Sequence, residues 1–306
     1  MEEIMARSKV EIFENTFVTL ARRAGGGYKT IAEKTRIAQT FLDYLKTSGI
    51  KLRQVQSVKT KYIESYIAHR REAGLKIRTL QNEMSTFRSI YREAGMHKLA
   101  DPNNSRLSNK ALGLSGASRD GNKIALSHER FLEAFAKVEK KDVGVAAAMQ
   151  LSYYLGLRNK EAIQSVKSLL TWKSAIERGD KTLRVVFGTK GGRPRDTTII
   201  QRDNVIRAIN YALRFAGENN NKLVDRPSMH SAMDRYRNVL RRDGGLAQEN
   251  SPHSLRYSYA QASTLFHQAG GMSKEEATAM TSMDLGHGDG RGRYVERVYH
   301  QGGLES

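Results

Sequence analysis

The chain of 306 residues is long enough for two domains with buried cores, and its 51 Lys and Arg against 32 Asp and Glu give a net charge of +19. It contains no cysteine, which excludes disulfides, thiolate metal sites and a cysteine nucleophile. It has no apolar run of about eighteen residues and no secretion signal at its start, so we expect a soluble protein of the cytoplasm.

Positive charge is shared by both parts of the chain. Residues 1–120 carry 22 basic and 12 acidic side chains, a net charge of +10, and the remainder carries 29 and 20, a net charge of +9. A single basic tail on a neutral protein would not give this distribution. The balance favours two lobes that each contact a polyanion, most simply nucleic acid, with an anionic membrane surface as the alternative.

Four helices are predicted in the first third of the chain. Apolar residues recur at helical spacing over residues 9–23, 30–47, 58–73 and 80–91, and glycines follow each stretch. We therefore predict a helical domain over residues 1–105. Its basic residues favour contact with DNA over a merely solvated face. They include Lys59, Lys61, Arg70, Arg71, Lys76, Arg78 and Arg88.

The rest of the chain is predicted to form a linker and a second domain. Residues 106–123 are rich in Asn, Ser, Gly and charge, which is typical of a linker. Over residues 124–306 we predict helices at 127–138, 143–155, 205–215 and 229–240. The runs 182–187 and 197–200, joined by a turn at 189–195, predict a β-hairpin. The expected fold class is mainly α, with a mixed, mostly helical second domain that holds this small hairpin.

A helix is also predicted to begin near Ser251. Serine is a favoured N-cap, and Pro252 suits the first turn because it has no N–H to leave unpaired. His253 and Arg256 would then share one face of the first turn, where backbone N–H groups favour an anion. That face could hold a phosphate. Taken alone, a surface arginine and a capping or core histidine are the alternative interpretation.

Four motifs occur in a definite order along the second domain. They are Gly156-Leu157-Arg158, the hairpin lysine Lys190, the pair His253 and Arg256, and Leu285-Gly286-His287 followed by tyrosines. This order resembles the catalytic domain of the tyrosine recombinases, the phage-integrase family, over roughly residues 125–306. The helical first domain looks like the DNA core-binding domain of that family, though by pattern and not by motif.

The resemblance implies a site-specific recombinase or integrase. Such an enzyme cleaves a DNA strand to a 3′-phosphotyrosine linkage and rejoins it, with no metal, ATP or other cofactor. Arg158 and Arg256 would bind the phosphate, because a guanidinium group donates two aligned hydrogen bonds and keeps its charge. Lys190 would protonate the leaving 5′-oxygen, and Glu161 would orient a neighbouring group. The implied catalytic residues are Arg158, Lys190, His253, Arg256, His287 and Tyr299.

The position of the nucleophile departs from the family. The family's tyrosine usually follows the second histidine by about nine residues, where this chain has Glu296; the nearby tyrosines are Tyr294 and Tyr299. Five residues turn a helix through about 140°, so we expect only one of them to face the site. We choose Tyr299, because residues 288–292 resemble a loop insertion that would lengthen the spacing. Tyr294 would then be a packing aromatic.

The expected partner is double-stranded DNA at specific recombination sites, bound by a homotetramer on two sites, and no membrane. The resemblance also allows accessory DNA-bending proteins and an origin in a phage or another mobile genetic element. Two alternatives stay open. A type IB topoisomerase would use the same chemistry to relax DNA, and a catalytically silent, sequence-specific DNA-binding protein would keep the fold without turnover.

Overall fold

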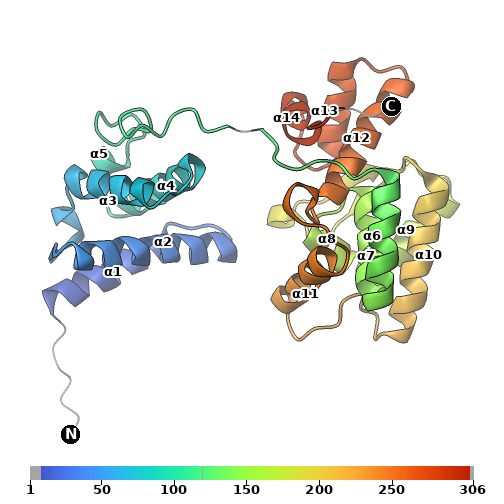
Figure 1. Cartoon of the computed structure of the whole chain (residues 1–306), viewed down its shortest axis with the longest axis horizontal. Coiled ribbons are helices and arrows are strands. Elements are labelled where there is room, and N and C mark those ends of the chain that lie inside the picture. Colours follow the sequence, from blue (N-terminus) through green and yellow to red (C-terminus); the bar gives the residue numbers. More distant parts are fainter. Residues whose placement is uncertain (1–7, 119, 304–306) are drawn as a thin grey trace, which may run out of the picture. The chain divides into compact units, whose positions relative to one another are not determined.

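A computed structural model describes residues 8–118 and 120–303 of the chain. The chain divides into two compact units, Met1–Ser118 and Arg119–Ser306. Both units are helical, and the described residues of the second unit contain one antiparallel sheet of two strands (Figure 1). The predicted fold class is confirmed.

The first unit is a helical bundle with an aromatic core. Ser8 caps the first helix in a reciprocal capping box with Glu11. The rings of Phe17, Phe41 and Phe87 are buried and meet edge to face or tilted, which fills the space between three helices. The four predicted helices are present. The helices are α1 (Lys9–Arg23), α2 (Tyr28–Thr47), α3 (Thr60–Glu72), α4 (Ile77–Glu93) and the short α5 (His97–Ala100).

The first unit extends beyond the predicted boundary at residue 105. Leu107 and Leu114 are fully buried in its core. Arg88 of α4 donates to the carbonyl oxygen of Leu107, and Gln81 donates to that of Leu114. Residues 106–118 of the predicted linker therefore pack on the first unit. Two isolated leucines in a polar stretch show no periodicity, and this is why the sequence pattern missed them.

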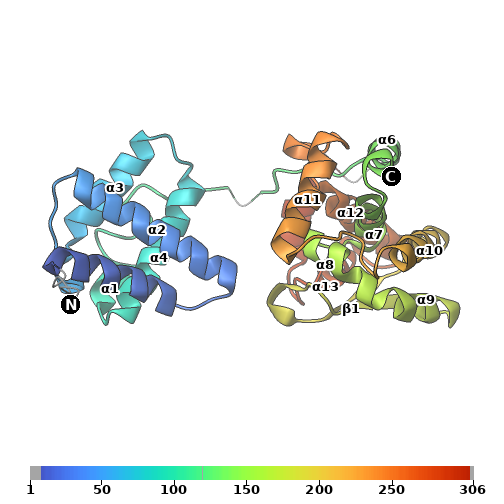
Figure 2. The same ribbon diagram turned by 90° about the horizontal axis from the view of Figure 1, so that it is seen from below.

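The second unit is built around helix α7, which is apolar on nearly all sides. Nine of its residues are buried, and α6 and α10 pack along it (Figures 1 and 2). The elements of this unit are α6 (His128–Lys141), α7 (Val143–Leu155), α8 (Asn159–Gln164), α9 (Leu169–Glu177), β1 (Thr182–Val185), β2 (Arg195–Thr198), α10 (Arg202–Glu218), α11 (Met229–Arg242), α12 (Ser254–Ala269), α13 (Lys274–Asp284) and α14 (Gly292–Tyr299).

The hairpin is present, but its second strand begins earlier than predicted. Strand β2 starts at Arg195, which pairs with Val185 of β1. The predicted turn, residues 189–195, includes Arg195. Its side chain instead points into the protein and is 4% exposed, and in the whole strand only Asp196 is exposed.

Helix α12 begins at Ser254, with His253 as its N-cap, two residues after the predicted cap Ser251. The amide of Ser254 donates to the carbonyl oxygen of Ser251 at 2.7 Å, which closes a turn before the helix. The amide of Arg256 donates to the carbonyl oxygen of His253 at 3.0 Å, so these two residues lie on the same first turn. Phosphate binding by this turn stays a prediction. Arg256 lies inside the unit, 1% exposed, whereas His253 is exposed.

The segment entering the second unit runs along helix α14. The amide of Gly121 donates to the carbonyl oxygen of Arg297 at 3.2 Å, and the Asp120 carboxylate accepts from the Arg297 guanidinium. Further along, the amide of Ile124 donates to the carbonyl oxygen of Glu249, just before the turn that carries His253. This segment thus holds α14 and the approach to α12 together.

Among residues 8–118 and 120–303, no helix combines the length and the apolar character needed to cross a membrane.

We predict that Gly121→Ala destabilises the second unit. The added methyl would lie 1.9 Å from the carbonyl oxygen of Val298, so α14 or the entering segment must move. Such overpacking lowers the free energy of unfolding by about 1–3 kcal/mol. Urea unfolding followed by circular dichroism measures this change.

Gly217→Ala is the matched control, because its methyl would meet no atom within 4 Å near the end of α10. We expect this variant to be neutral or slightly stabilised. Equal stability of Gly121→Ala and the unmodified chain would contradict the close packing of the entering segment on α14.

Candidate active site

The site begins where helix α7 ends at Gly156. This residue has a left-handed backbone with φ +59°, and an added Cβ would lie 2.4 Å from the ring of Tyr259. Only glycine fits both conditions. The chain therefore turns sharply after α7, and Arg158 becomes the residue that precedes α8.

Arg158 is held by the buried carboxylate of Glu161. One oxygen of Glu161 accepts from the guanidinium of Arg158 at 2.6 Å, and the other accepts from its backbone amide at 2.8 Å. Arg158 also donates to the carbonyl oxygen of Leu285 at 3.1 Å and keeps 23% of its side chain exposed. Glu161 orients a neighbouring group, as the sequence predicted, and Arg158 presents a fixed positive charge to solvent.

Arg256 lies deeper and reaches the same place from helix α12. Its two terminal nitrogens donate to the carbonyl oxygens of Gly156 and Leu285. Its Nε lies 3.5 Å from the hydroxyl of Tyr299, and its terminal nitrogen lies 4.0 Å from Glu161. The arginine therefore bridges the segment before Arg158 and the segment before His287.

His287 and Tyr299 are in direct contact. The hydroxyl of Tyr299 and the Nε2 of His287 are 2.9 Å apart. Tyr299 ends α14 and is 2% exposed, and its backbone carbonyl accepts from Gln261 of α12 at 3.1 Å. The hydroxyl and the backbone of Tyr299 are thus both held, and the hydroxyl lies beside Arg256.

Tyr294 also lies at the site, contrary to our expectation. Its ring centroid is 5.0 Å from that of His287 and 6.3 Å from that of Tyr299, and the residue is 40% exposed. Tyr294 and Tyr299 leave the helix in directions about 140° apart. Their side chains are long enough that both rings still reach His287. Only Tyr299, however, has its hydroxyl bonded to His287.

His253 and Lys190 take more open positions. The ring of His253 is 6.4 Å from that of Tyr299, centroid to centroid, and the residue is exposed. Lys190 is exposed in the turn between β1 and β2, and it has no hydrogen bond or ion pair to the part of the chain that the structure describes. An added Cβ at Gly188 would lie 2.7 Å from the carbonyl oxygen of Lys160, so this turn starts beside α8.

The arginine cluster shifts the pKa of the acidic and basic groups around it. Burial alone would raise the pKa of Glu161, but the guanidinium groups of Arg195, Arg256 and Arg158 together lower it. Burial, and then the charges of Arg256 and Arg158, lower the pKa of His287 to about 3. The pKa of His253 is lowered to about 4, first because protein surrounds the part of the ring that does not reach solvent, and then by the charges of Arg256, Arg158 and Lys123. Glu161 is therefore a carboxylate, and both histidines are neutral imidazoles near pH 7 in the DNA-free protein.

Two buried residues of the site were not foreseen from the sequence. Arg195 donates to Glu161 at 3.0 Å and to the carbonyl oxygen of Gly156 at 3.1 Å. Asp284 ends α13 and accepts from Thr198 of β2 and from Ser263 of α12, both at 2.7 Å. Neither belongs to a recognised motif. No sequence signal marks either as buried, because the residues of β2 are all polar and Asp284 is a charged residue at the end of α13.

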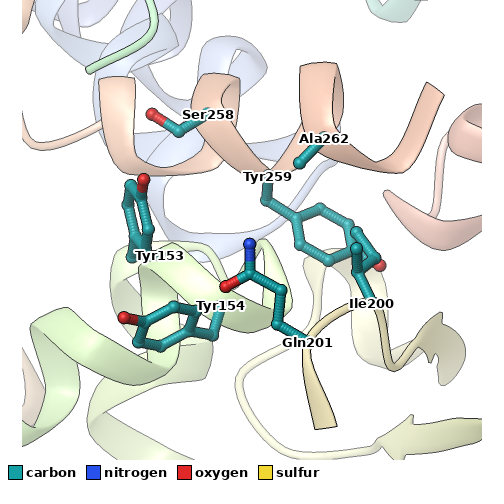
Figure 3. Close-up of a pocket in the computed structure, with 7 residues that line it drawn as sticks. All are labelled: Tyr153, Tyr154, Ile200, Gln201, Ser258, Tyr259 and Ala262. Atoms are coloured by element: carbon teal, nitrogen blue, oxygen red, sulfur yellow. The ribbon is translucent and has the colours of Figure 1, made fainter. Parts of the chain in front are cut away.

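A small pocket beside α12 carries none of the predicted catalytic residues. Figure 3 shows it between Tyr153 and Tyr154 of α7 and the residues Ser258 and Tyr259 of α12. The Tyr259 hydroxyl is already bonded to Thr198, and the Ser258 hydroxyl to Leu126. None of the residues that line this pocket is a predicted catalytic residue, and we assign it no role in catalysis.

Two family models match the chain. The model described as "Phage integrase, N-terminal" matches residues 11–100, and the model described as "Integrase" matches residues 113–262. The second range contains four of the six predicted catalytic residues and ends before the remaining two, His287 and Tyr299. Comparison with curated protein sequences gives no significant match.

Solved structures share this fold. A lambda integrase dimer bound to a COC′ core site has 16% identity and a TM-score of 0.59, over 97% of this chain and 79% of that one. XerH site-specific recombinase bound to difH substrate has 15% identity and a TM-score of 0.56, over 96% and 83%. The Tn1549 transposon integrase with a circular intermediate DNA has 12% identity and a TM-score of 0.56, over 92% and 93%. A lambda integrase tetramer bound to a Holliday junction has 18% identity and a TM-score of 0.57, over 92% of this chain and 75% of that one.

With both of its units matched by integrase models, the chain belongs to the tyrosine recombinase, or phage-integrase, family.

Proposed function

We propose that this protein is a site-specific DNA recombinase that cuts and rejoins DNA through a 3′-phosphotyrosine intermediate. The observation that carries the proposal is the hydroxyl of Tyr299, which lies 2.9 Å from His287 and 3.5 Å from Arg256. A nucleophile beside a group that can take its proton, and beside a fixed cation, is what attack on a phosphodiester requires. A protein that only binds DNA would have no need for this arrangement.

The charge of the site supports a phosphate as its ligand. Three guanidinium groups, from Arg158, Arg195 and Arg256, surround the single carboxylate of Glu161, which leaves an excess of two positive charges. Each terminal nitrogen of Arg256 carries two hydrogens and donates one to a carbonyl oxygen, so a second remains for a phosphate oxygen. A DNA phosphate would neutralise part of this buried charge.

We propose the following cleavage step. The oxygen of Tyr299 attacks phosphorus and forms the Tyr299–phosphate bond, while the bond from phosphorus to the 5′-oxygen breaks. His287 takes the proton of the phenol, and the ammonium of Lys190 protonates the leaving 5′-oxygen. Arg158 and Arg256 stabilise the charge on the other phosphate oxygens. A 5′-hydroxyl from a partner strand reverses the step, so no energy source is consumed and no cofactor is needed.

The proposed partner is intracellular double-stranded DNA at specific sites. Relatives of this fold have been seen on core-site DNA and, for lambda integrase, as a tetramer on a Holliday junction. We propose that four copies of this chain assemble in the same way on two sites. Basic charge in both halves of the chain supports contact with DNA from each unit. Accessory DNA-bending proteins would act on the same complex.

We predict that Arg256→Lys slows cleavage strongly but leaves DNA binding nearly unchanged. One ammonium group cannot bridge two carbonyl oxygens and also donate to a phosphate, so about 100-fold in cleavage rate should be lost. The substrate is DNA selected from a random-sequence library by binding to the full chain. Gel shift measures binding, and a nicked substrate that traps the covalent adduct measures cleavage.

Arg178→Lys is the control for this substitution, because Arg178 is 62% exposed and pairs only with Asp180 among the described charged residues. It should cleave at the unmodified rate. If Arg256→Lys also cleaves normally, the phosphate is not held at this cluster.

We predict that Lys190→Ala is rescued by a better leaving group. Loss of a general acid slows cleavage by about 100-fold or more when the leaving atom is a 5′-oxygen. A 5′-sulfur leaves without a proton, so the variant should cleave that substrate about as fast as the unmodified chain. If the sulfur substrate remains slow with Lys190→Ala, Lys190 has another role.

A further inference from the structure

Arg195 is the one guanidinium of the cluster that the proposed chemistry does not use. It is the first residue of β2, and its side chain is 4% exposed. It lies five residues beyond Lys190, at the base of the same hairpin. No phosphate could reach it without displacing neighbouring groups, so its role must be exerted through other residues.

The contacts of Arg195 join the segment that carries Arg158 and Glu161 to the segment that leads to His287. One terminal nitrogen donates to the carbonyl oxygen of Gly156 at 3.1 Å and to Glu161 at 3.0 Å. The other donates to the carbonyl oxygen of Asp284. Gly156 precedes Arg158, Glu161 holds Arg158, and Asp284 precedes the turn to His287. A single planar group therefore sets the spacing between Arg158 and His287.

The surroundings are shaped to this side chain. An added Cβ at Gly286 would lie 2.6 Å from the Cδ of Arg195, and Gly286 has a left-handed backbone with φ +66°. The glycine of the Leu285-Gly286-His287 motif thus makes room for Arg195 as well as turning the chain. A lysine could not make the same contacts, because one ammonium group cannot donate in plane to two segments.

Stability alone does not explain a buried arginine at this place. Burial and the nearby charge of Arg256 both lower the pKa of Arg195, which shows that the charged form is held at a cost. Well-packed apolar residues often replace buried ion pairs with no loss of stability. The Nε of Arg195 moreover has no hydrogen-bond partner in the described structure. A role in the geometry of the site accounts for this arrangement better.

We propose that Arg195 is a positioning residue that fixes Arg158, through Glu161, and the turn to His287, through Asp284, before DNA binds. This inference rests on the proposed recombinase function. According to this proposal, Arg195 supports the residues that bind the phosphate. It does not affect the protonation of the leaving 5′-oxygen by Lys190. Misplacement of such a group by about 1 Å slows the reaction by about 100-fold without removing any catalytic group.

The test compares three variants of the full chain, Arg195→Lys, Lys190→Ala and the control Arg184→Lys, on nicked substrates with a 5′-oxygen or a 5′-sulfur. Arg184 lies on the neighbouring strand, is 63% exposed and pairs with Asp196, so its replacement should change nothing. Arg195→Lys should bind DNA within about twofold of the unmodified chain and cleave both substrates about 100-fold more slowly. Lys190→Ala should be slow on the oxygen substrate only.

Three other results with the Arg195 variants would overturn this proposal. Normal cleavage by Arg195→Lys would show that the guanidinium group of Arg195 is dispensable. If the sulfur substrate restored cleavage by Arg195→Lys, Arg195 would act through Lys190 instead. Thermal melting of Arg195→Lys and Arg195→Gln separates positioning from folding, and loss of cooperative melting in both would make Arg195 a requirement of the fold. If the unmodified chain forms no adduct on either substrate, the proposed function itself fails.

Discussion

The buried carboxylate of Glu161 is the group around which the candidate active site is organised. It accepts from Arg158 and Arg195 and lies 4.0 Å from Arg256, so it brings together residues from α8, β2 and α12. Without it, three guanidinium groups would repel one another in a place of low dielectric constant. With the Glu161 carboxylate in place, the excess positive charge is fixed near the surface, where Arg158 is exposed. The site is therefore preorganised to bind an anion.

The rest of the unit serves to place a phenol against this charge. Asp284 ties the end of α13 to β2 and α12, which fixes the turn to His287. Helix α14 is held on one side by Gln261 of α12 and on the other by Gly121 of the entering segment. The first described residues of the second unit are therefore attached directly to the helix that ends in Tyr299.

Local signals made most of the fold predictable, and long-range contacts account for the differences. Helix α7 was bounded correctly because an apolar run ended at Gly156. Leu107, Leu114 and Arg195 were assigned to surface segments, because nothing near them in sequence shows what they pack against. The motif order pointed to Arg158, Arg256, His287 and Tyr299, which the structure brings together. It could not reveal that Tyr294 also reaches His287, since that depends on how the 288–292 loop places α14.

The identity of the nucleophile is the central claim, and peptide mass spectrometry of the trapped covalent adduct tests it most directly. The unmodified chain and the variants Tyr299→Phe and Tyr294→Phe would each be incubated with the nicked, selected DNA. The account predicts an adduct on Tyr299, its loss in Tyr299→Phe and its persistence in Tyr294→Phe, because only the Tyr299 hydroxyl is bonded to His287. An adduct on Tyr294, or tight binding with no adduct at all, would contradict it.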